Sequence, residues 1–300
     1  MFNNYNLIIK PKHYNILYSK YVIFSKFKYN ILYMIKKRIK NKNAIIDGNS
    51  IFMRYFYAIP EKFNSDGIPV HGLLAFCRFI LNFIRDYNPS SVLVVFDKCY
   101  NNFRKQISPE YKVNRTKLSD SAKDQLNLSF EFCQKSGIPV EFHSEYEGDD
   151  LIGSFVHQNP SEEFIIMSTD KDLCQLVQSN VYIFNPFTKT LIDQDFVYTK
   201  YNVPARHFHL FLALTGDSSD NIKGIPGVGP KTAAKILSYL SDYDDIHKVM
   251  PMFPKYDFSD WNMQLQLTCI NKEVQLSNPN PSSINLNQEF IQEFFRIFDN

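Results

Sequence analysis

From residue 44 onward, short apolar runs alternate with longer segments whose apolar residues recur at a helical period. The runs at 44–47, 92–97, 138–142, 164–170 and 181–185 have the length of buried strands. Between them, the segment 70–87 has the periodicity of an amphipathic helix. Strands that alternate with helices predict a parallel sheet with helices on both faces. We therefore expect an α/β fold with a central, mainly parallel sheet flanked by helices.

The pattern changes beyond residue 201, where helical and turn-rich segments follow one another without a clear strand. A proline-containing loop is expected at 278–283, and a short final helix at 288–298. We predict an α/β core over 44–204 and a helical region over 205–300.

The first 43 residues differ from the rest in charge. They hold ten Lys or Arg and no Asp or Glu, which leaves 23 basic and 31 acidic residues in 44–300, a balance of −8. An acid-free basic leader is typical of a transit segment, so we expect an organelle location, plastid-like or mitochondrial. The alternative is an uncleaved basic extension that contacts DNA. No apolar run reaches about 18 residues, so no membrane span is expected.

Five cysteines are scattered along the chain with no CxxC pair. An odd number without a ligand spacing argues against a disulfide framework and against a zinc ribbon. We expect free, buried thiols in a reducing compartment. Because 44% of the residues are hydrophobic, the chain can bury a sizeable core, which excludes a disordered protein.

Acidic residues follow the predicted strands. Three strands end in aspartate, at Asp47, Asp97 and Asp170. In an open parallel sheet the carboxyl ends of the strands form the site-bearing edge, although a single aspartate there is more often the N-cap of the next helix. Further acids stand in the segments EGDD, STDKD and GDSSDN. The whole set is Asp47, Asp97, Glu147, Asp149, Asp150, Asp170, Asp172, Asp217 and Asp220.

Spacing predicts which of these side chains meet. Glu147 and Asp150 are three residues apart and share a helix face, with Asp149 beside them. Asp172 points the same way as Asp170 if the chain is still extended there. The two aspartates of GDSSDN would come together on a helical turn.

Clustered carboxylates repel one another strongly unless cations neutralise them. Lysines are too sparse in these motifs to neutralise nine acids. Oxygen ligands without His or Cys select Mg²⁺ or Mn²⁺, and a pair of such ions is the usual apparatus of phosphodiester cleavage. The sequence therefore predicts a site for two divalent cations.

Residues 222–237, IKGIPGVGPKTAAKIL, have the pattern of a helix–hairpin–helix. Gly224, Gly227 and Gly229 allow the backbone to approach a phosphate closely, and the helix that starts at Pro230 would aim free N–H groups at it. Lysines at 223, 231 and 235 add positive charge. The alternative is an ordinary Pro/Gly loop before a capped helix.

Six segments, in order, resemble the 5′-nuclease superfamily of flap endonucleases and 5′→3′ exonucleases, and most closely the 5′→3′ exonuclease domain of bacterial DNA polymerase I. They are IIDGNSIFMRYFYAIP, VLVVFDKCYNNFR, EYKVNR, GIPVEFHSEYEGDDLIG, STDKDLCQLV and LTGDSSDNIKGIPGVGPKTAAKIL. The resemblance covers about residues 44–285. It implies a nuclease core over 44–204, with a helical arch over 98–130, followed by a helix–hairpin–helix region.

The resemblance implies a metal-dependent phosphodiesterase that cuts DNA near the junction of a 5′ flap or 5′ end with a duplex, in replication and repair. The products carry a 5′-phosphate and a 3′-hydroxyl. Five of the nine acids (47, 97, 147, 149 and 150) would surround a first metal ion, and the other four a second. The arch cations Lys112 and Arg115 would face the scissile phosphate.

The resemblance also implies DNA contacts. A K⁺ ion would be held by the hairpin backbone. The expected contact residues are Arg54, Tyr111, Lys223, Gly224, Gly227, Gly229, Lys231 and Thr232. The partner would be branched or 5′-ended duplex DNA, or RNA–DNA, bound by a monomer.

One departure concerns the helix after Asp47, where the family has an aromatic residue that stacks on a substrate base. This chain has Met53 at that position. Phe52 or Tyr55 could substitute, although each points elsewhere on a helix. A degenerate nuclease that only binds branched DNA is therefore an alternative, and an RNA-directed nuclease is another. No polymerase or proofreading segment follows, so we expect a stand-alone nuclease; the sequence leaves exo- and endonuclease preference open.

Overall fold

The computed structural model describes residues 36–99, 102–241 and 245–299. It divides into a first unit, Met1–Lys40, and a second compact unit, Asn41–Asn300. In the first unit only 36–40 are described, with 36–39 helical, so the expected transit segment lies almost wholly outside the described residues. Everything that follows concerns the second unit.

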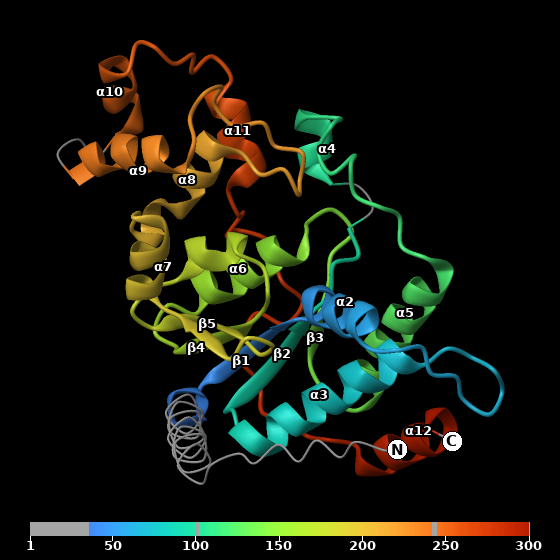
Figure 1. The fold of residues 1–300 in the computed structure, drawn as a ribbon. Helices are drawn as coiled ribbons and strands as arrows, with labels where there is room; N and C mark the ends of the chain where they lie inside the picture. The colour runs from blue at the N-terminus through green and yellow to red at the C-terminus, as the bar shows by residue number, and fades with distance from the viewer. Residues whose placement is uncertain (1–35, 100–101, 242–244, 300) are drawn as a thin grey trace, which may run out of the picture. The chain divides into compact units, whose positions relative to one another are not determined.

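A six-stranded sheet forms the centre of the described part of this unit (Figure 1). In spatial order its strands are β3 (Val140–Glu141), β2 (Ser91–Val95), β1 (Asn43–Asp47), β4 (Phe164–Met167), β5 (Val181–Asn185) and β6 (Thr190–Ile192). The first five are parallel, and β6 runs antiparallel to β5. The α/β fold class is confirmed. Strand β6 was not expected, because three half-buried residues carry too short a pattern.

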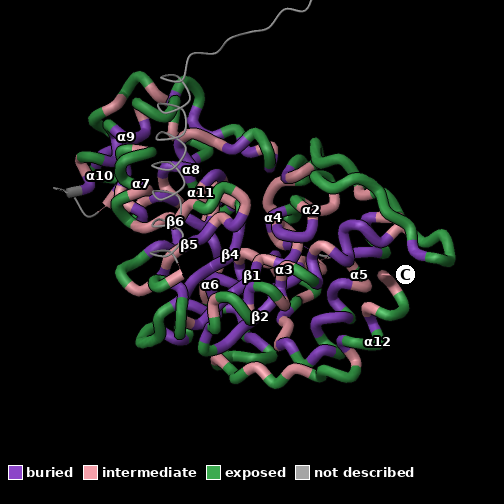
Figure 2. Tube along the Cα trace, turned by 60° about the horizontal axis from the view of Figure 1, so that its bottom comes forward, coloured by how far each residue is buried: buried purple, intermediate pink, exposed green. Residues whose placement is uncertain are grey.

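Helices cover both faces of the sheet (Figures 1 and 2). Helix α6 (Gly148–Gln158) packs its apolar side against β1, β2 and β4, where Leu151 and Phe155 share one core with Ile45. The opposite face carries α2 (Gly48–Ala58), α3 (His71–Tyr87) and α5 (Asp120–Lys135), which pack together.

Helix α3 matches the expected 70–87 closely, and both of its ends have a physical explanation. Its N-cap, Val70, has no side chain that can accept a hydrogen bond. Gln125 of α5 replaces that cap, because its Oε1 accepts from the backbone N–H groups of Gly72 (2.9 Å) and Leu73 (3.1 Å). The helix ends at Asn88, whose left-handed backbone stops it.

Beyond residue 203 the described chain is helical and has no strand, as expected. Its α-helices are α8 (Phe208–Thr215), α9 (Pro230–Ser238), α10 (Ile246–Val249), α11 (Trp261–Thr268) and α12 (Gln288–Phe298). Helix α7 (Gln194–Tyr201) precedes them, and short 3₁₀ turns lie at Asp172–Leu176, Ala205–His207, Tyr239–Ser241 and Met250–Met252. In the expected arch segment, α4 (Phe103–Ile107) and the start of α5 flank a non-helical stretch at 108–119.

The final helix is anchored far from its neighbours in sequence. Phe294 of α12 packs on the fully buried Phe132 of α5, with ring centroids 4.6 Å apart. Asp299 then accepts hydrogen bonds from Lys62 (2.7 Å) and from Arg78. The end of the chain is thus tied to the loop after α2 and to α3.

None of the five cysteines, all of which lie in the described ranges, is in a disulfide, and Cys77, Cys133 and Cys174 are buried, as expected. Cys99 and Cys269 are half-buried. Of the helices within the described ranges, none has the length and apolar character needed to cross a membrane.

Candidate active site

The carboxyl edge of the central strands carries a cavity of about 320 Å³. Strand β1 ends at Asp47, while Asp97 and Asp170 follow β2 and β4 by two and three residues. All three line this cavity. Its other charged lining residues are Glu147, Asp149, Asp220, Lys112 and Arg115. The structure thus brings six of the nine predicted acids to one cavity, together with both predicted arch cations.

Asp47 both caps the following helix and lines the acidic cavity, which are the two positions considered for a strand-ending aspartate. Its Oδ1 accepts from the backbone N–H of Ser50 at 3.0 Å, so it caps α2. Its Oδ2 accepts from the Ser168 hydroxyl at 2.6 Å, across from β1 to the end of β4. Both bonds fix the carboxylate at the wall of the cavity.

Asp150 does not face the cavity. It is fully buried and forms a two-pronged ion pair with Arg104, at 2.8 and 2.7 Å. Arg104 also donates to Glu147 (3.1 Å) and to the backbone oxygens of Leu267 and Cys269. The expectation that Asp150 is a metal ligand beside Glu147 is therefore not supported, because a buried arginine from α4 occupies both of its oxygens.

Three further cations hold predicted acids. Lys112 pairs with Glu147, Arg115 pairs with Asp220, and Lys171 pairs with Asp217 at 2.7 Å. These pairs and the Arg104 cluster define a cation-paired group, namely Glu147, Asp150, Asp217 and Asp220. Only Lys171 stands within an acidic motif, as the sparse lysines of these motifs led us to expect. The other three cations come from elsewhere in the chain, and together the four pair with four of the nine acids.

The pairing has electrostatic consequences. Burial acts to raise the pKa of Glu147, but Lys112 and Arg104 outweigh it and hold that pKa below its ordinary value. Burial likewise opposes the effect of Lys171 on Asp217, whose pKa is nevertheless lowered. These two acids are ionised at neutral pH.

The remaining acids form a cation-poor group: Asp47, Asp97, Asp149, Asp170 and Asp172. Only Asp172 has an ion pair with a described residue, a long one of 3.9 Å to Lys171. Burial is the main cause that raises the pKa of all five, to about 6 for Asp47 and about 8 for Asp172. Neighbouring carboxylates raise them further.

Asp172 differs from its predicted geometry. The chain is no longer extended there, since Asp172 opens a 3₁₀ turn and its backbone N–H donates to Asp170 Oδ1 at 2.8 Å. Its Oδ1 is buried and has no hydrogen-bond partner among the described residues. Asp217 and Asp220 lie on a turn, as expected, but pair with different cations and do not line the same cavity.

No three His, Cys, Asp or Glu side chains in the described ranges form a ready-made metal site. The donor set is nevertheless made of oxygens, and the five cation-poor acids include an unsatisfied buried oxygen. Such groups are stable together when they are protonated or when cations join them. The residues therefore fit divalent cations chemically, although their side chains are not yet gathered as ligands.

Tyr111 does not have the exposure expected of a DNA contact. It is buried, and its hydroxyl donates toward Glu147 (2.9 Å) and Asp220 (3.2 Å). It links the two acids that Lys112 also contacts. Its hydroxyl ties the non-helical stretch 108–119 to the acid cluster.

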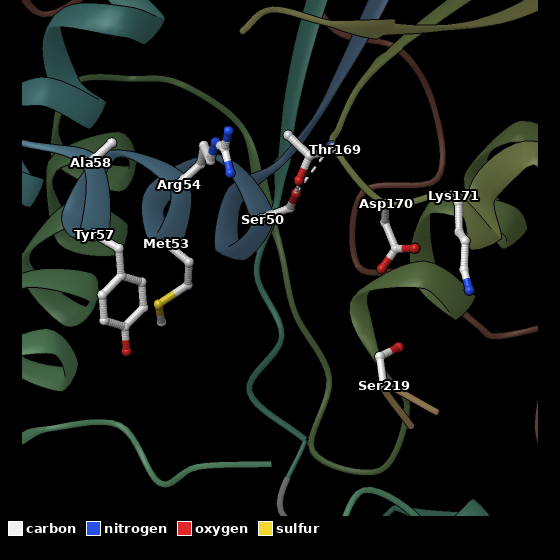
Figure 3. A pocket seen from close by; sticks show the side chains of 9 residues that line it. All are labelled: Ser50, Met53, Arg54, Tyr57, Ala58, Thr169, Asp170, Lys171 and Ser219. Atoms are coloured by element: carbon white, nitrogen blue, oxygen red, sulfur yellow. Dashed lines mark hydrogen bonds between the residues drawn. The ribbon is translucent and has the colours of Figure 1, made fainter. Parts of the chain in front are cut away.

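A larger pocket, of about 740 Å³, adjoins the acidic cavity, and Ser50, Met53 and Asp170 line both (Figure 3). Arg54 lines the larger pocket, and its contact with DNA stays a prediction. The two aromatic candidates do not line it: Phe52 is buried against Phe76, and Tyr55 packs on Phe79 and Phe187.

Tyr57 is the lining residue that the sequence analysis missed. It lies four residues after Met53, hence on the same face of α2. The four-residue spacing from Met53 is the feature of the sequence that indicates Tyr57.

The glycine loop joins α8 to α9. Gly224 is buried with a left-handed backbone, and a Cβ there would collide with the backbone of Gly216. Its glycine requirement is thus explained by packing within the loop rather than by an approaching phosphate. Gly227 and Gly229 are exposed, and Gly229 is the N-cap of α9.

Three predicted contacts around this loop are at least partly accessible. Lys231 is exposed and Thr232 is half-buried in the first turn of α9. Lys223 is exposed and pairs with Glu110 at 3.0 Å.

Comparison with known families assigns the chain. The model for the 5′-3′ exonuclease N-terminal resolvase-like domain matches residues 42–202, and the model for the 5′-3′ exonuclease C-terminal SAM fold matches 203–279. The chain belongs to the 5′-3′ exonuclease family. A 5′-3′ exonuclease of Aquifex aeolicus is 33% identical over 238 residues, which cover 77% of this chain and 82% of that protein.

Two further comparisons extend the picture. DNA polymerase I of Caldicellulosiruptor bescii is 36% identical over 215 residues, covering 69% of this chain but only 25% of the polymerase. Among solved structures, a bacteriophage T5 flap endonuclease in a complex with DNA and metal ions shares the fold, with a TM-score of 0.61 at 21% identity over 77% of this chain and 88% of that one.

Proposed function

We propose that this chain is a metal-dependent 5′ nuclease that hydrolyses DNA near the junction of a 5′ flap or 5′ end with a duplex, and that it serves in flap or primer removal. The observation that carries the proposal is the cation-poor group, four of whose five acids line the cavity that also holds Lys112 and Arg115. A cavity with excess buried carboxylates and fixed cations suits a phosphodiester and the divalent ions that accompany it.

Two Mg²⁺ or Mn²⁺ ions are the proposed cofactors. The raised pKa values of the five acids, and the Asp172 Oδ1 that accepts no hydrogen bond from the described residues, support this choice, since bound cations would offset the cost of burying these carboxylates in their ionised form. The cation-poor acids would hold such ions, and the ions would supply a water of lowered pKa and charge stabilisation for the leaving oxygen. Asp150 is excluded from the proposed ligands by its pairing with Arg104.

Lys112 and Arg115 are the proposed catalytic cations. In the structure they balance the charge of Glu147 and Asp220 at the cavity wall. We infer that both turn toward the scissile phosphate when substrate is bound, where a positioned cation stabilises the charge that grows in the transition state. Lys112 is well placed for this, because the acids around it raise its pKa against the effect of burial and keep it charged.

DNA is the proposed substrate, bound by a monomer. The T5 relative has DNA and metal ions in its structure, which supports this choice. The exposed N-terminus of α9, with Gly227, Gly229 and Lys231, would contact the duplex backbone, and a K⁺ ion is proposed at the same hairpin. RNA–DNA hybrids are proposed as a further substrate, and the basic leader as an organelle-targeting segment.

The decisive experiment is cleavage of a 5′-labelled double-flap DNA with Mg²⁺ and with EDTA. We expect metal-dependent cutting at the junction. Asp170→Asn should abolish cleavage yet preserve or strengthen DNA binding, because it removes repulsion between a carboxylate and the phosphates. Binding without any cutting by the unmodified chain would instead indicate a structure-recognising module, and undiminished turnover by Asp170→Asn would contradict the assigned site.

A further inference from the structure

The larger pocket of about 740 Å³, called the outer pocket from here on, has one wall formed by an aromatic residue. Helix α2 presents Met53 and Tyr57 on the same side, toward the pocket, and Asp170, Lys171 and Ser219 stand across from them (Figure 3). Tyr57 is 71% exposed, although it carries a large aromatic ring. Its neighbour Phe56 contacts it with the two ring planes nearly perpendicular, at 5.2 Å between centroids, and so restricts the ring.

The pocket has the size and charge distribution for part of a nucleic acid. About 740 Å³ lies within the range of small-ligand pockets. Arg54 borders it on α2, and Lys171 borders it on the opposite wall. Lys171 pairs with Asp217 in this structure. An exposed aromatic ring in a pocket that basic residues also line is an arrangement with which proteins stack a nucleobase.

Tyr57 also has a defined distance from the cavity. Met53 lines both the cavity and the outer pocket, and Tyr57 lies one helical turn further on. Four residues of α-helix span about 6 Å. Successive nucleotides of one strand are about 3.4 Å apart along a duplex, so a strand that followed α2 outward from the cavity would reach Tyr57 within about two nucleotides.

We propose that Tyr57 is a positioning residue whose ring stacks on a DNA base one or two nucleotides from the scissile phosphate, with Met53 covering the side nearer the cavity. The proposal rests on the proposed nuclease function and names one contact within it. It assigns the stacking role to a residue one turn beyond Met53, in place of the buried Phe52 and the packed Tyr55. Tyr57 therefore sets which phosphodiester bond of the substrate lies in the cavity, and it takes no part in breaking that bond.

The test compares Tyr57→Ala, Tyr57→Phe and, as a matched control, Tyr198→Ala, which removes another exposed tyrosine on α7. Each is assayed on a double-flap DNA and on copies with one abasic nucleotide at successive positions around the cut. We expect Tyr57→Ala to raise KM by about 5- to 100-fold, the range that one base–aromatic stack supports, and to spread the cleavage positions. Tyr57→Phe should behave like the unmodified chain.

At one abasic position the unmodified chain and Tyr57→Ala should become equal, because the base that stacks is missing. A 2-aminopurine at that position should be quenched on binding in Ca²⁺, and the quenching should disappear in Tyr57→Ala. A loss that is the same on every abasic substrate, or no larger than that of Tyr198→Ala, would overturn the proposal. Quenching is read without cleavage, so an inactive chain that still quenches would disprove the nuclease function and keep the stacking contact.

Discussion

The cation-paired and cation-poor acids lie side by side at one sheet edge, yet they are stabilised in opposite ways. Glu147 and Asp217 are held as anions by Lys112 and Lys171, which come from other segments. The cation-poor group, by contrast, has raised pKa values and an unsatisfied oxygen on Asp172. The difference indicates that one half of the cluster is complete within the chain, whereas the other half depends on protons or on added cations.

The largest effect is expected when a cation is removed from the cation-paired group, and it is a loss of stability. Arg104→Ala should lower the free energy of unfolding by about 3–5 kcal/mol, because it leaves the buried Asp150 without its partner. Urea unfolding in EDTA measures this. Lys171→Ala is the matched control and should cost less, since the Lys171 side chain is 44% exposed. Equal losses for the two variants would show that burial does not set the value of these pairs.

Two adjacent acids allow a sharper separation. Asp149→Asn should reduce cleavage about 100-fold or more with no loss of stability, because Asp149 lines the cavity and has no cation. Asp150→Asn should mainly reduce stability, because Asp150 neutralises Arg104. Steady-state cleavage and thermal unfolding of both variants decide the matter. Similar profiles for the two would contradict the division of the EGDD motif.

The smallest expected effect is a pH dependence in the absence of metal. Asp172 ionises near pH 3.9 in an unfolded chain but near pH 8 in the fold. Between these values the folded chain keeps a proton that the unfolded chain has lost, so this group makes stability fall as the pH rises from about 4 to 8. Asp172→Asn should therefore be more stable than the unmodified chain at pH 8 by about 1 kcal/mol, with the difference gone near pH 4.

Thermal unfolding in EDTA across this pH range tests the sign. Asp217→Asn is the control with the opposite expectation, because Lys171 lowers the pKa of Asp217 against the effect of burial. Its stabilising contribution is present above the unfolded pKa and is lost on acidification. A variant at Asp172 that is less stable than the unmodified chain at pH 8 would contradict the idea of an uncompensated charge.

Much of the fold followed from local pattern, because buried strands and amphipathic helices impose their period on the sequence. The limits of α12 and β5 were predicted to the residue. The carboxylates that end or follow strands also came together as expected, since parallel strands share one edge. Strand β6 escaped because its three residues are half-buried and carry no alternation.

The division within the acid cluster could not be predicted, because it depends on partners distant in sequence. Asp149 and Asp150 look alike in the motif, and only Arg104, 46 residues away, distinguishes them. The direction of Asp172 depends on a 3₁₀ turn that no residue type announces. The sequence favoured Phe52 and Tyr55 as aromatic substitutes because they stand within two residues of Met53, although helical spacing places Tyr57 on the same face as Met53.

The anchoring of α12 has a consequence for how the chain is made. Lys62 and Asp299 are separated by 237 residues, so their contact forms only after this long segment has been synthesised and has left the ribosome. Until then the Phe132 face of α5 lacks its cover, and closing so long a loop is slow. The docking of the last helix is therefore expected to be the late, sequence-distant step that completes folding, during which this aromatic surface is exposed to chaperones and to self-association.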